Sequence, residues 1–163
     1  MTNQPPANAL AYLATPYSKY PSGIEQAFID ASKLAGLLMR AGMRVYSPIA
    51  HCHPIAIHAS IDPMDHSIWL PFDRAMMQAA DVLFVAHMDG WQESYGIAEE
   101  IKFFELARKP IFDLHPRELT LIKRGSGVPH QEKHIEQMTL AELREERNYW
   151  DHLCGNLRTI SKT

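Results

Sequence analysis

The segment from His87 to Tyr95, HMDGWQESY, carries two carboxylates, a serine, a glycine and a tryptophan directly after an apolar run. That run, Val82 to Ala86, has the length of a strand and is apolar at every position, which is typical of a parallel strand buried between two helix layers. Ligands of open α/β sheets bind beyond the carboxyl ends of the strands. We therefore expect Asp89, Glu93 and Ser94 to act on a small ligand.

A second polar loop follows the predicted first strand, residues 9–14. Its sequence, TPYSKYPSG, contains Tyr17 and Ser18 and lies at the same edge of the predicted sheet. Neither a GxGxxG fingerprint nor a P-loop is present, so a dinucleotide or Walker site is not predicted. The loop is a candidate binding element, and the alternative is a solvated turn rich in helix and strand breakers.

The segment from Ile49 to Pro71 shows no regular pattern, and we predict a long loop that acts as a lid or binding element. Trp69 would anchor it to the core or face a flat ring of the ligand. Zinc is an alternative because the segment is rich in nitrogen, sulfur and oxygen ligands. The possible zinc ligands are His51, Cys52, His53, His58, Asp62, Asp65 and His66. They lack the paired spacing of a structural zinc site, so we expect no metal.

The elements around these segments alternate between strands and helices. Apolar residues recur at helical spacing over residues 24–41, after Ser22 as a possible cap and before Gly42 as a stop. We further predict a strand over 43–47, a short helix over 72–79 with Asp73 in its first turn, a helix from Ile97 to Ala107, a strand at 111–112 and an edge strand over 119–122. Strand–helix–strand units of this kind build a right-handed parallel α/β sheet.

The chain reads as one domain with extensions at both ends. We predict a disordered tail over 1–8, an α/β domain over 9–114 and a C-terminal extension over 115–163. Within the extension, a capping box predicts a helix over 140–154.

Composition narrows the partners and the compartment. With 16 basic and 19 acidic residues and a formal charge of −3, the chain is not expected to bind a nucleic-acid polymer. Cys52 and Cys154 form no CxxC pair, and we find no secretory segment, so a cytoplasmic protein is expected. Because no apolar run approaches the length of a membrane span, no membrane association is predicted.

Three stretches in the same order resemble one protein family. They are YLATPYS, FDRAMMQAADVLFVA, and DGWQESYGIAEEI followed by KPI. Over about residues 10–114 the chain resembles the nucleoside 2-deoxyribosyltransferase-like superfamily, and in particular its uncharacterised branch with a GW-x-x-S-x-G motif. The resemblance implies a three-layer flavodoxin-like or Rossmann-like fold, no cofactor, cleavage of N-glycosidic bonds, and a homo-oligomer in which neighbouring subunits complete the site.

The resemblance also implies roles for particular residues. Tyr12, Asp73 and Asp89 match the family's tyrosine near the nucleophile and two of its carboxylates. The family's nucleophilic glutamate aligns with Ser94 when Gly90 and Gly96 are matched. Glu93 lies one residue earlier and Glu100 lies further along the next helix, and we prefer Glu93 slightly as the reactive carboxylate.

The catalytic candidates are therefore Asp89, Glu93, Glu100 and Asp73, and the expected ligand contacts are Tyr12, Tyr17, Ser18, Trp91, Ser94, Gly96, His51 and Trp69. We expect Asp73 and Asp89 to position the ribose and Ser94 to contact its 5′ side. The expected function is cleavage or transfer of the N-glycosidic bond of a nucleoside or nucleoside 5′-monophosphate. The alternatives are a catalytically silent nucleotide-binding or sensing module and a metal-dependent hydrolase that uses the histidine-rich segment.

Overall fold

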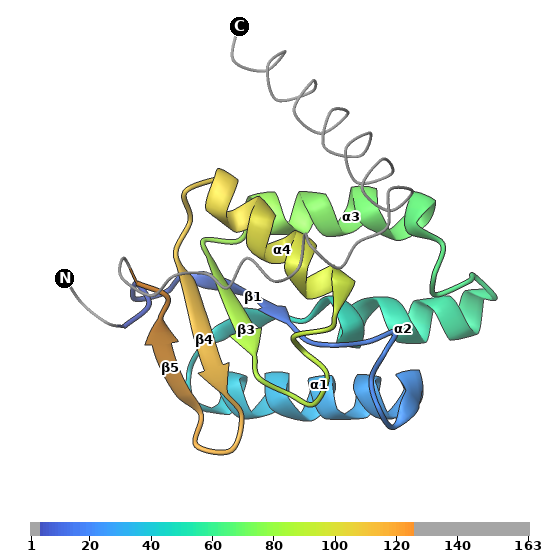
Figure 1. The fold of residues 1–163 in the computed structure, drawn as a ribbon, viewed down its shortest axis with the longest axis horizontal. Coiled ribbons are helices and arrows are strands. Elements are labelled where there is room, and N and C mark those ends of the chain that lie inside the picture. The colour runs from blue at the N-terminus through green and yellow to red at the C-terminus, as the bar shows by residue number, and fades with distance from the viewer. Residues whose placement is uncertain (1–3, 126–163) are drawn as a thin grey trace, which may run out of the picture. The chain divides into compact units, whose positions relative to one another are not determined.

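A computed structural model describes residues 4–125; residues 1–3 and 126–163, and with them the predicted helix over 140–154, lie outside the described part. Residues 4–125 form five strands and four helices (Figure 1). In chain order these are β1 (Leu10–Ala14), α1 (Gly23–Arg40), β2 (Arg44–Tyr46), α2 (Pro48–Ala59), α3 (His66–Ala79), β3 (Val82–Ala86), α4 (Tyr95–Leu106), β4 (Ile111–His115) and β5 (Thr120–Lys123).

The strands form one sheet in the order β2-β1-β3-β4-β5. The first four run parallel, and β5 pairs antiparallel with β4 at the edge. Helix α1 covers one face of the sheet, and α3 and α4 cover the other (Figure 1). The predicted α/β fold with a flavodoxin-like or Rossmann-like arrangement is confirmed, and it carries one antiparallel edge strand.

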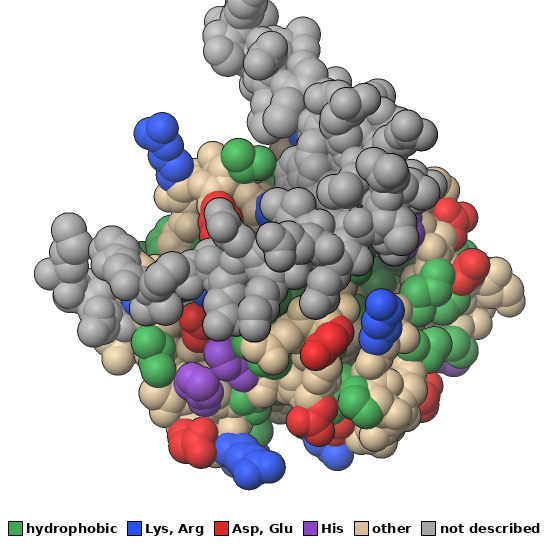
Figure 2. All heavy atoms as spheres, viewed as in Figure 1, with side chains coloured by type: hydrophobic (Ala, Val, Ile, Leu, Met, Phe, Trp, Pro, Cys, Tyr) green, Lys and Arg blue, Asp and Glu red, His purple; other side chains and the backbone are tan. Residues whose placement is uncertain are grey.

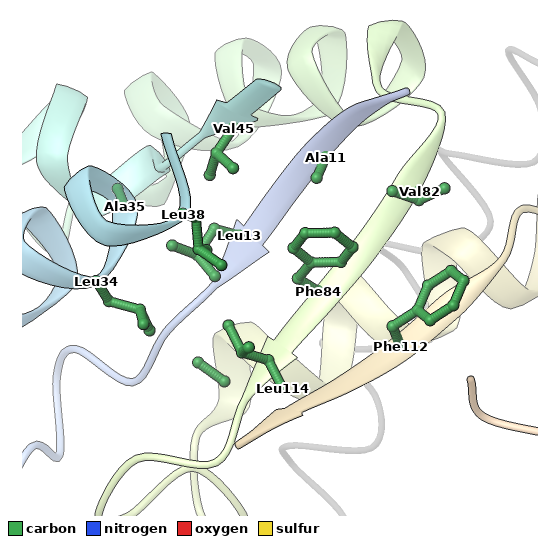
Figure 3. Packing of buried hydrophobic residues seen from close by; sticks show 11 residues of the cluster. Ala11, Leu13, Leu34, Ala35, Leu38, Val45, Val82, Phe84, Phe112 and Leu114 are labelled. Carbon is green, nitrogen blue, oxygen red and sulfur yellow. The ribbon is translucent and has the colours of Figure 1, made fainter. Parts of the chain in front are cut away.

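The continuous apolar runs exist because the central strands are buried on both faces. Leu13 and Phe84 face α1, where they pack against Leu34 and Leu38 (Figure 3). The alternate residues of the same strands, such as Leu83, face α3 and α4. Burial at every position of β3 leaves no polar alternation in its sequence.

The chain changes faces between β1 and β3, which are neighbours although α1, β2, α2 and α3 separate them in sequence. Such a switch point places two loops side by side at the carboxyl ends of the strands. Here the loops touch: a Cβ at Gly90 would lie 3.4 Å from the Lys19 carbonyl oxygen. Gly90 also has φ +78°, so a side chain there would be strained.

The prediction of a long irregular loop over 49–71 is wrong, because helices α2 and α3 occupy most of this segment. The Ser47 hydroxyl accepts a hydrogen bond from the Ala50 N–H and caps α2, and the Asp65 carboxylate caps α3. The helix predicted over 72–79 is therefore only the second half of α3, and Asp73 lies in its middle rather than in its first turn. Pro54 and Pro71 lie inside the two helices, where proline normally signals an end.

The remaining predicted elements in residues 4–125 agree with the structure to within a few residues. Residues 4–8, predicted to be part of a disordered tail, include a turn in which the Ala9 N–H donates to the Pro6 carbonyl oxygen at 3.1 Å. The compact unit that contains the sheet extends to Gly125 and so includes β5.

Lys109 donates to the carbonyl oxygens of Met77, Gln78 and Ala80 and thereby joins the start of β4 to the end of α3.

On the face shown in Figure 2, basic and acidic side chains are interspersed over the visible described residues. None of the helices in residues 4–125 is long and apolar enough to cross a membrane.

Candidate functional site

Five titratable side chains from five different elements meet on the face of the sheet covered by α3 and α4. They come from the middle of β1, the end of β2 and the three helices that follow. We refer to them as the carboxyl cluster: Tyr12, Tyr46, Cys52, Asp73 and Glu100. Their assembly depends on the fold, because β1 and β2 are paired directly at Tyr12 and Tyr46.

Tyr12 and Glu100 form the buried end of the carboxyl cluster, in which Glu100 as a whole is half-buried but its Oε2 is inaccessible to solvent. Tyr12 has no exposed surface, and neither its hydroxyl nor Oε2 of Glu100 makes a hydrogen bond of ordinary geometry. Burial raises the pKa of Glu100 well above its usual value, and the nearby Asp73 raises it further, while interaction with the Tyr12 hydroxyl opposes the shift. Burial, Glu100 and Asp73 also raise the pKa of Tyr12, so its phenol keeps its proton.

Asp73 and Cys52 form the half-buried end. The Cys52 Sγ donates to Oδ1 of Asp73 at 3.8 Å. Burial raises the pKa of Asp73 to about 6, although the thiol hydrogen bond opposes this shift. Burial and the Asp73 charge raise the pKa of Cys52 to about 12, so the thiol serves as a hydrogen-bond donor and not as a nucleophile.

Aromatic rings surround the carboxyl cluster. The ring of Tyr46 lies 5.7 Å from that of Tyr12, and burial raises the pKa of Tyr46 above its usual value. On the outer side, His51 stacks on Phe72 with ring centroids 5.0 Å apart, and Tyr12 contacts Phe104 on the inner side. The carboxyl groups therefore sit in largely apolar surroundings, which explains why burial dominates their pKa shifts.

The arrangement suits acid–base and nucleophilic chemistry. Two neighbouring carboxyl groups with raised pKa values share protons, so one can be charged while the other remains an acid. A carboxylate next to a carboxylic acid is the pair that glycosidic cleavage requires. Asp73, with a pKa near 6, is suited to exchange protons at neutral pH.

The structure brings three of the predicted site residues together, namely Tyr12, Asp73 and Glu100. Asp89 and Glu93 are exposed in the loop between β3 and α4. Asp89 lies near Tyr20 of the neighbouring loop. Burial and Asp30 are the larger causes that raise the pKa of Tyr20, and the charge of Asp89 adds to them. Glu93, the preferred candidate from sequence, thus lies at the surface, whereas Glu100 reaches Tyr12.

The other predicted residues of the loop before α4 have local structural roles. Ser94 is buried at the start of α4, where its Oγ accepts from the Ile97 N–H at 3.4 Å. Trp91 stacks on His87 with centroids 4.1 Å apart. Gly96 is exposed in the first turn of the helix.

Three further predicted contacts, Tyr17, Ser18 and Trp69, come from outside that loop and are not members of the carboxyl cluster. Tyr17 is half-buried, and its hydroxyl lies 2.7 Å from Nδ1 of His53. Ser18 is exposed. Trp69 donates from Nε1 to the Asp62 carbonyl oxygen at 2.9 Å, so it anchors the connection between α2 and α3.

The sequence does not predict that Tyr46, Cys52 or His53 contacts a small-molecule substrate. It offers Cys52 and His53 only as alternative zinc ligands, because the irregular pattern over residues 49–71 does not predict helix α2. His51 and His53 turn to different partners, Phe72 and Tyr17 respectively. Among residues 4–125, no group of three or more His, Cys, Asp or Glu side chains is arranged to hold a metal ion.

The fold and the carboxyl cluster define an α/β protein with a flavodoxin-like strand order and paired carboxyl groups beside its first two strands. Residues 9–115 match a protein family described as a domain of unknown function, DUF1937, and the chain belongs to this family. A search of the curated proteins finds no match.

Proposed function

We propose that the protein cleaves or transfers the N-glycosidic bond of a nucleoside or nucleoside 5′-monophosphate, with Glu100 rather than Glu93 as the reactive carboxylate. The observation that carries this proposal is the convergence of Glu100 and Asp73 beside the buried Tyr12. The resemblance to nucleoside 2-deoxyribosyltransferases supports it, since Tyr12 matches the family's tyrosine close to the nucleophile and Asp73 matches one of its carboxylates.

The chemistry needs one proton shared by the two carboxyl groups. Burial favours this proton on Glu100, and its movement to Asp73 gives the reactive form. Glu100 then attacks C1′ of the sugar, the electron pair of the C1′–N bond passes to the base, and Asp73 donates its proton to the departing base. The Tyr12 hydroxyl steadies the Glu100 carboxylate.

A second step releases the sugar. Asp73 removes a proton from water, or from an incoming base, as that molecule attacks C1′ and breaks the bond to Glu100. Water gives hydrolysis and a base gives transfer. Ser94 can donate its hydroxyl proton to the 5′ side of the ligand while its Oγ caps α4, and Asp89 remains our candidate for positioning the ribose.

The test is release of free base from a panel of 2′-deoxynucleosides and nucleoside 5′-monophosphates, followed by chromatography. Glu100→Gln and Asp73→Asn should each lower the rate at least 100-fold, because each removes a group that acts in the transition state. Glu93→Gln and the exposed control Glu118→Gln should stay within about threefold. Loss of activity in Glu93→Gln with retention in Glu100→Gln would reverse the assignment.

A catalytically silent binding module is the second candidate, and the pKa of Glu100, which desolvation raises well above its usual value, favours it. A glutamic acid that stays protonated cannot attack C1′ but can donate a hydrogen bond to a ligand. Under this alternative a nucleoside or nucleotide binds, Asp73→Ala weakens the binding, and no base is released by the unmodified protein.

A further inference from the structure

His53 joins three separate elements in a chain of hydrogen bonds. Its ring, on α2, is only 4% exposed and stacks on Phe28 of α1 with centroids 4.6 Å apart. Nδ1 lies 2.7 Å from the hydroxyl of Tyr17, and Nε2 lies 2.9 Å from Oε2 of Glu25. A buried imidazole held on both nitrogens and by stacking has one defined orientation.

For a neutral His53 ring, the two partners determine the direction of both hydrogen bonds. The Glu25 carboxylate can only accept, so Nε2 of His53 carries the hydrogen. In the neutral ring Nδ1 then accepts, and Tyr17 donates to it. Burial, Glu25 and Cys52 raise the pKa of Tyr17 to about 12, so Tyr17 has a proton to donate. With its only proton committed to His53, the Tyr17 oxygen offers lone pairs to other groups.

Tyr17 is connected to the half-buried end of the carboxyl cluster through α2, since its hydroxyl lies 2.7 Å from Nδ1 of His53 and the preceding residue, Cys52, donates to Asp73 at 3.8 Å. Cys52 interacts electrostatically with Tyr17 and contacts Asp73, which in turn acts on Glu100. If Glu100 is at C1′ and Asp73 protonates the departing base, as the proposed function holds, Tyr17 lies on the side of the base. Its oxygen is then a hydrogen-bond acceptor for the base.

We propose that His53 is a positioning residue that turns the Tyr17 hydroxyl proton away from the ligand, so that Tyr17 selects nucleobases with an exocyclic amino group. Adenine and cytosine present an amino donor, whereas hypoxanthine and uracil present an oxo group at the same position. An oxo group would face the Tyr17 oxygen with two acceptors opposed and no proton between them. This inference rests on the proposed function for the identity of the ligand.

The first experiment tests the hydrogen-bond direction without any ligand. Nitrogen-15 NMR of the histidine rings at neutral pH, with His53 assigned by its absence in His53→Asn, should show the proton on Nε2 and an unprotonated Nδ1. A proton on Nδ1 would make His53 the donor and would overturn the proposal, whatever the protein does to nucleosides.

The second experiment compares 2′-deoxyadenosine with 2′-deoxyinosine, and 2′-deoxycytidine with 2′-deoxyuridine, by binding and by base release. We expect a preference of about tenfold for the amino-bearing member of each pair, the size of one hydrogen bond. Tyr17→Phe should reduce the preference to near one. His53→Gln, which leaves no acceptor at the Nδ1 position, should do the same, while His53→Asn, with an amide oxygen close to Nδ1, should retain it.

The controls separate positioning from loss of structure. His58→Asn changes an exposed histidine on the same helix and should leave the preference unchanged. In the double variant with Tyr17→Phe, His53→Gln should have no further effect on the preference. Cleavage of all four nucleosides without an amino preference overturns the proposal for Tyr17 and leaves the proposed function standing. If none of them binds or is cleaved, the proposed function fails and the base selectivity fails with it.

Discussion

Glu100 and Asp73 occupy surroundings that oppose their own ionisation. Burial raises the pKa of both groups, and no cation is among the causes that offset the shift. A fold selected only for stability would place apolar or amide side chains at these positions. The carboxyl pair therefore supports the proposed acid–base function.

Asp73→Asn should stabilise the protein at neutral pH. The pKa of Asp73 is about 6 in the folded chain against 3.8 for the unperturbed group, so the native state keeps a proton that the unfolded chain releases. The free energy of unfolding should therefore fall as pH rises from about 4 to about 6. Asp73→Asn should abolish this decrease, because an amide does not ionise. We expect a gain of about 2 kcal/mol at pH 7.5 that shrinks toward zero near pH 4, measured by urea unfolding. An equal gain at both pH values would contradict the assigned cause, and Glu93→Gln is the exposed control.

Cys52 should tune the acid limb of the pH–rate profile. Its thiol donates to Asp73 and opposes the increase in the Asp73 pKa. Cys52→Ser provides a stronger donor and should lower the pKa, while Cys52→Ala removes the donor and should raise it. Base release measured between pH 4 and 8 should show the acid limb moving in opposite directions in the two variants. Shifts in the same direction would point to a change in packing.

At the scale of elements, Lys109 holds the end of α3 to the start of β4. Its ammonium group donates to three carbonyl oxygens, at 3.2, 2.6 and 2.6 Å, two of them in the last turn of α3 and one on its C-cap residue Ala80. Lys109→Met should keep the packing of the stem but lower the free energy of unfolding by about 2 kcal/mol. The matched control is Lys33→Met, whose ammonium lies 3.9 Å from Asp30 and is 70% exposed, and it should change stability by less than about 0.5 kcal/mol. Equal losses in a denaturation series would exclude the capping role.

The sequence predicts the elements well where one physical signal dominates. The strand β3 is apolar throughout because it is buried on both faces, and α1 shows a clear helical period. Helix α2 and the first half of α3 are not predicted, because Pro54 and Pro71 interrupt the pattern and because the polar His53 is buried in α2. There the tertiary contacts, which a local pattern does not contain, decide the structure.

The helical spacing of α4 is enough to predict that Glu100 belongs to the candidate site. Spacing from Gly90 and Gly96 led to Glu93, yet Glu100 lies three residues after Ile97 and four before Phe104, two buried residues of α4. This spacing places Glu100 on the buried face of the helix. Asp73 was expected at the site only through the family resemblance, because no local pattern shows that α3, between β2 and β3, brings it close to Glu100.

At the scale of the whole molecule, the carboxyl cluster spans the boundary between core and surface. Tyr12 is fully buried, whereas Tyr46, Cys52 and Asp73 are only half-buried in a single chain. Apolar side chains are also exposed on the two helices that carry the outer members, among them Ile57 on α2 and Phe72 on α3. A second copy of the chain that packed on these helices would cover both the exposed apolar side chains and the half-buried members of the carboxyl cluster.

We therefore expect a homo-oligomer in solution. Burial of exposed apolar side chains between copies would favour association, and a neighbouring copy would complete the half-buried end of the carboxyl cluster. Light scattering of the full chain at micromolar concentration should give at least twice the mass of 18.6 kDa calculated from the sequence. Specific activity should fall on dilution at the concentration where the mass falls, because a separated subunit has an incomplete site. A monomeric mass with full activity would show that the carboxyl cluster of one chain is sufficient.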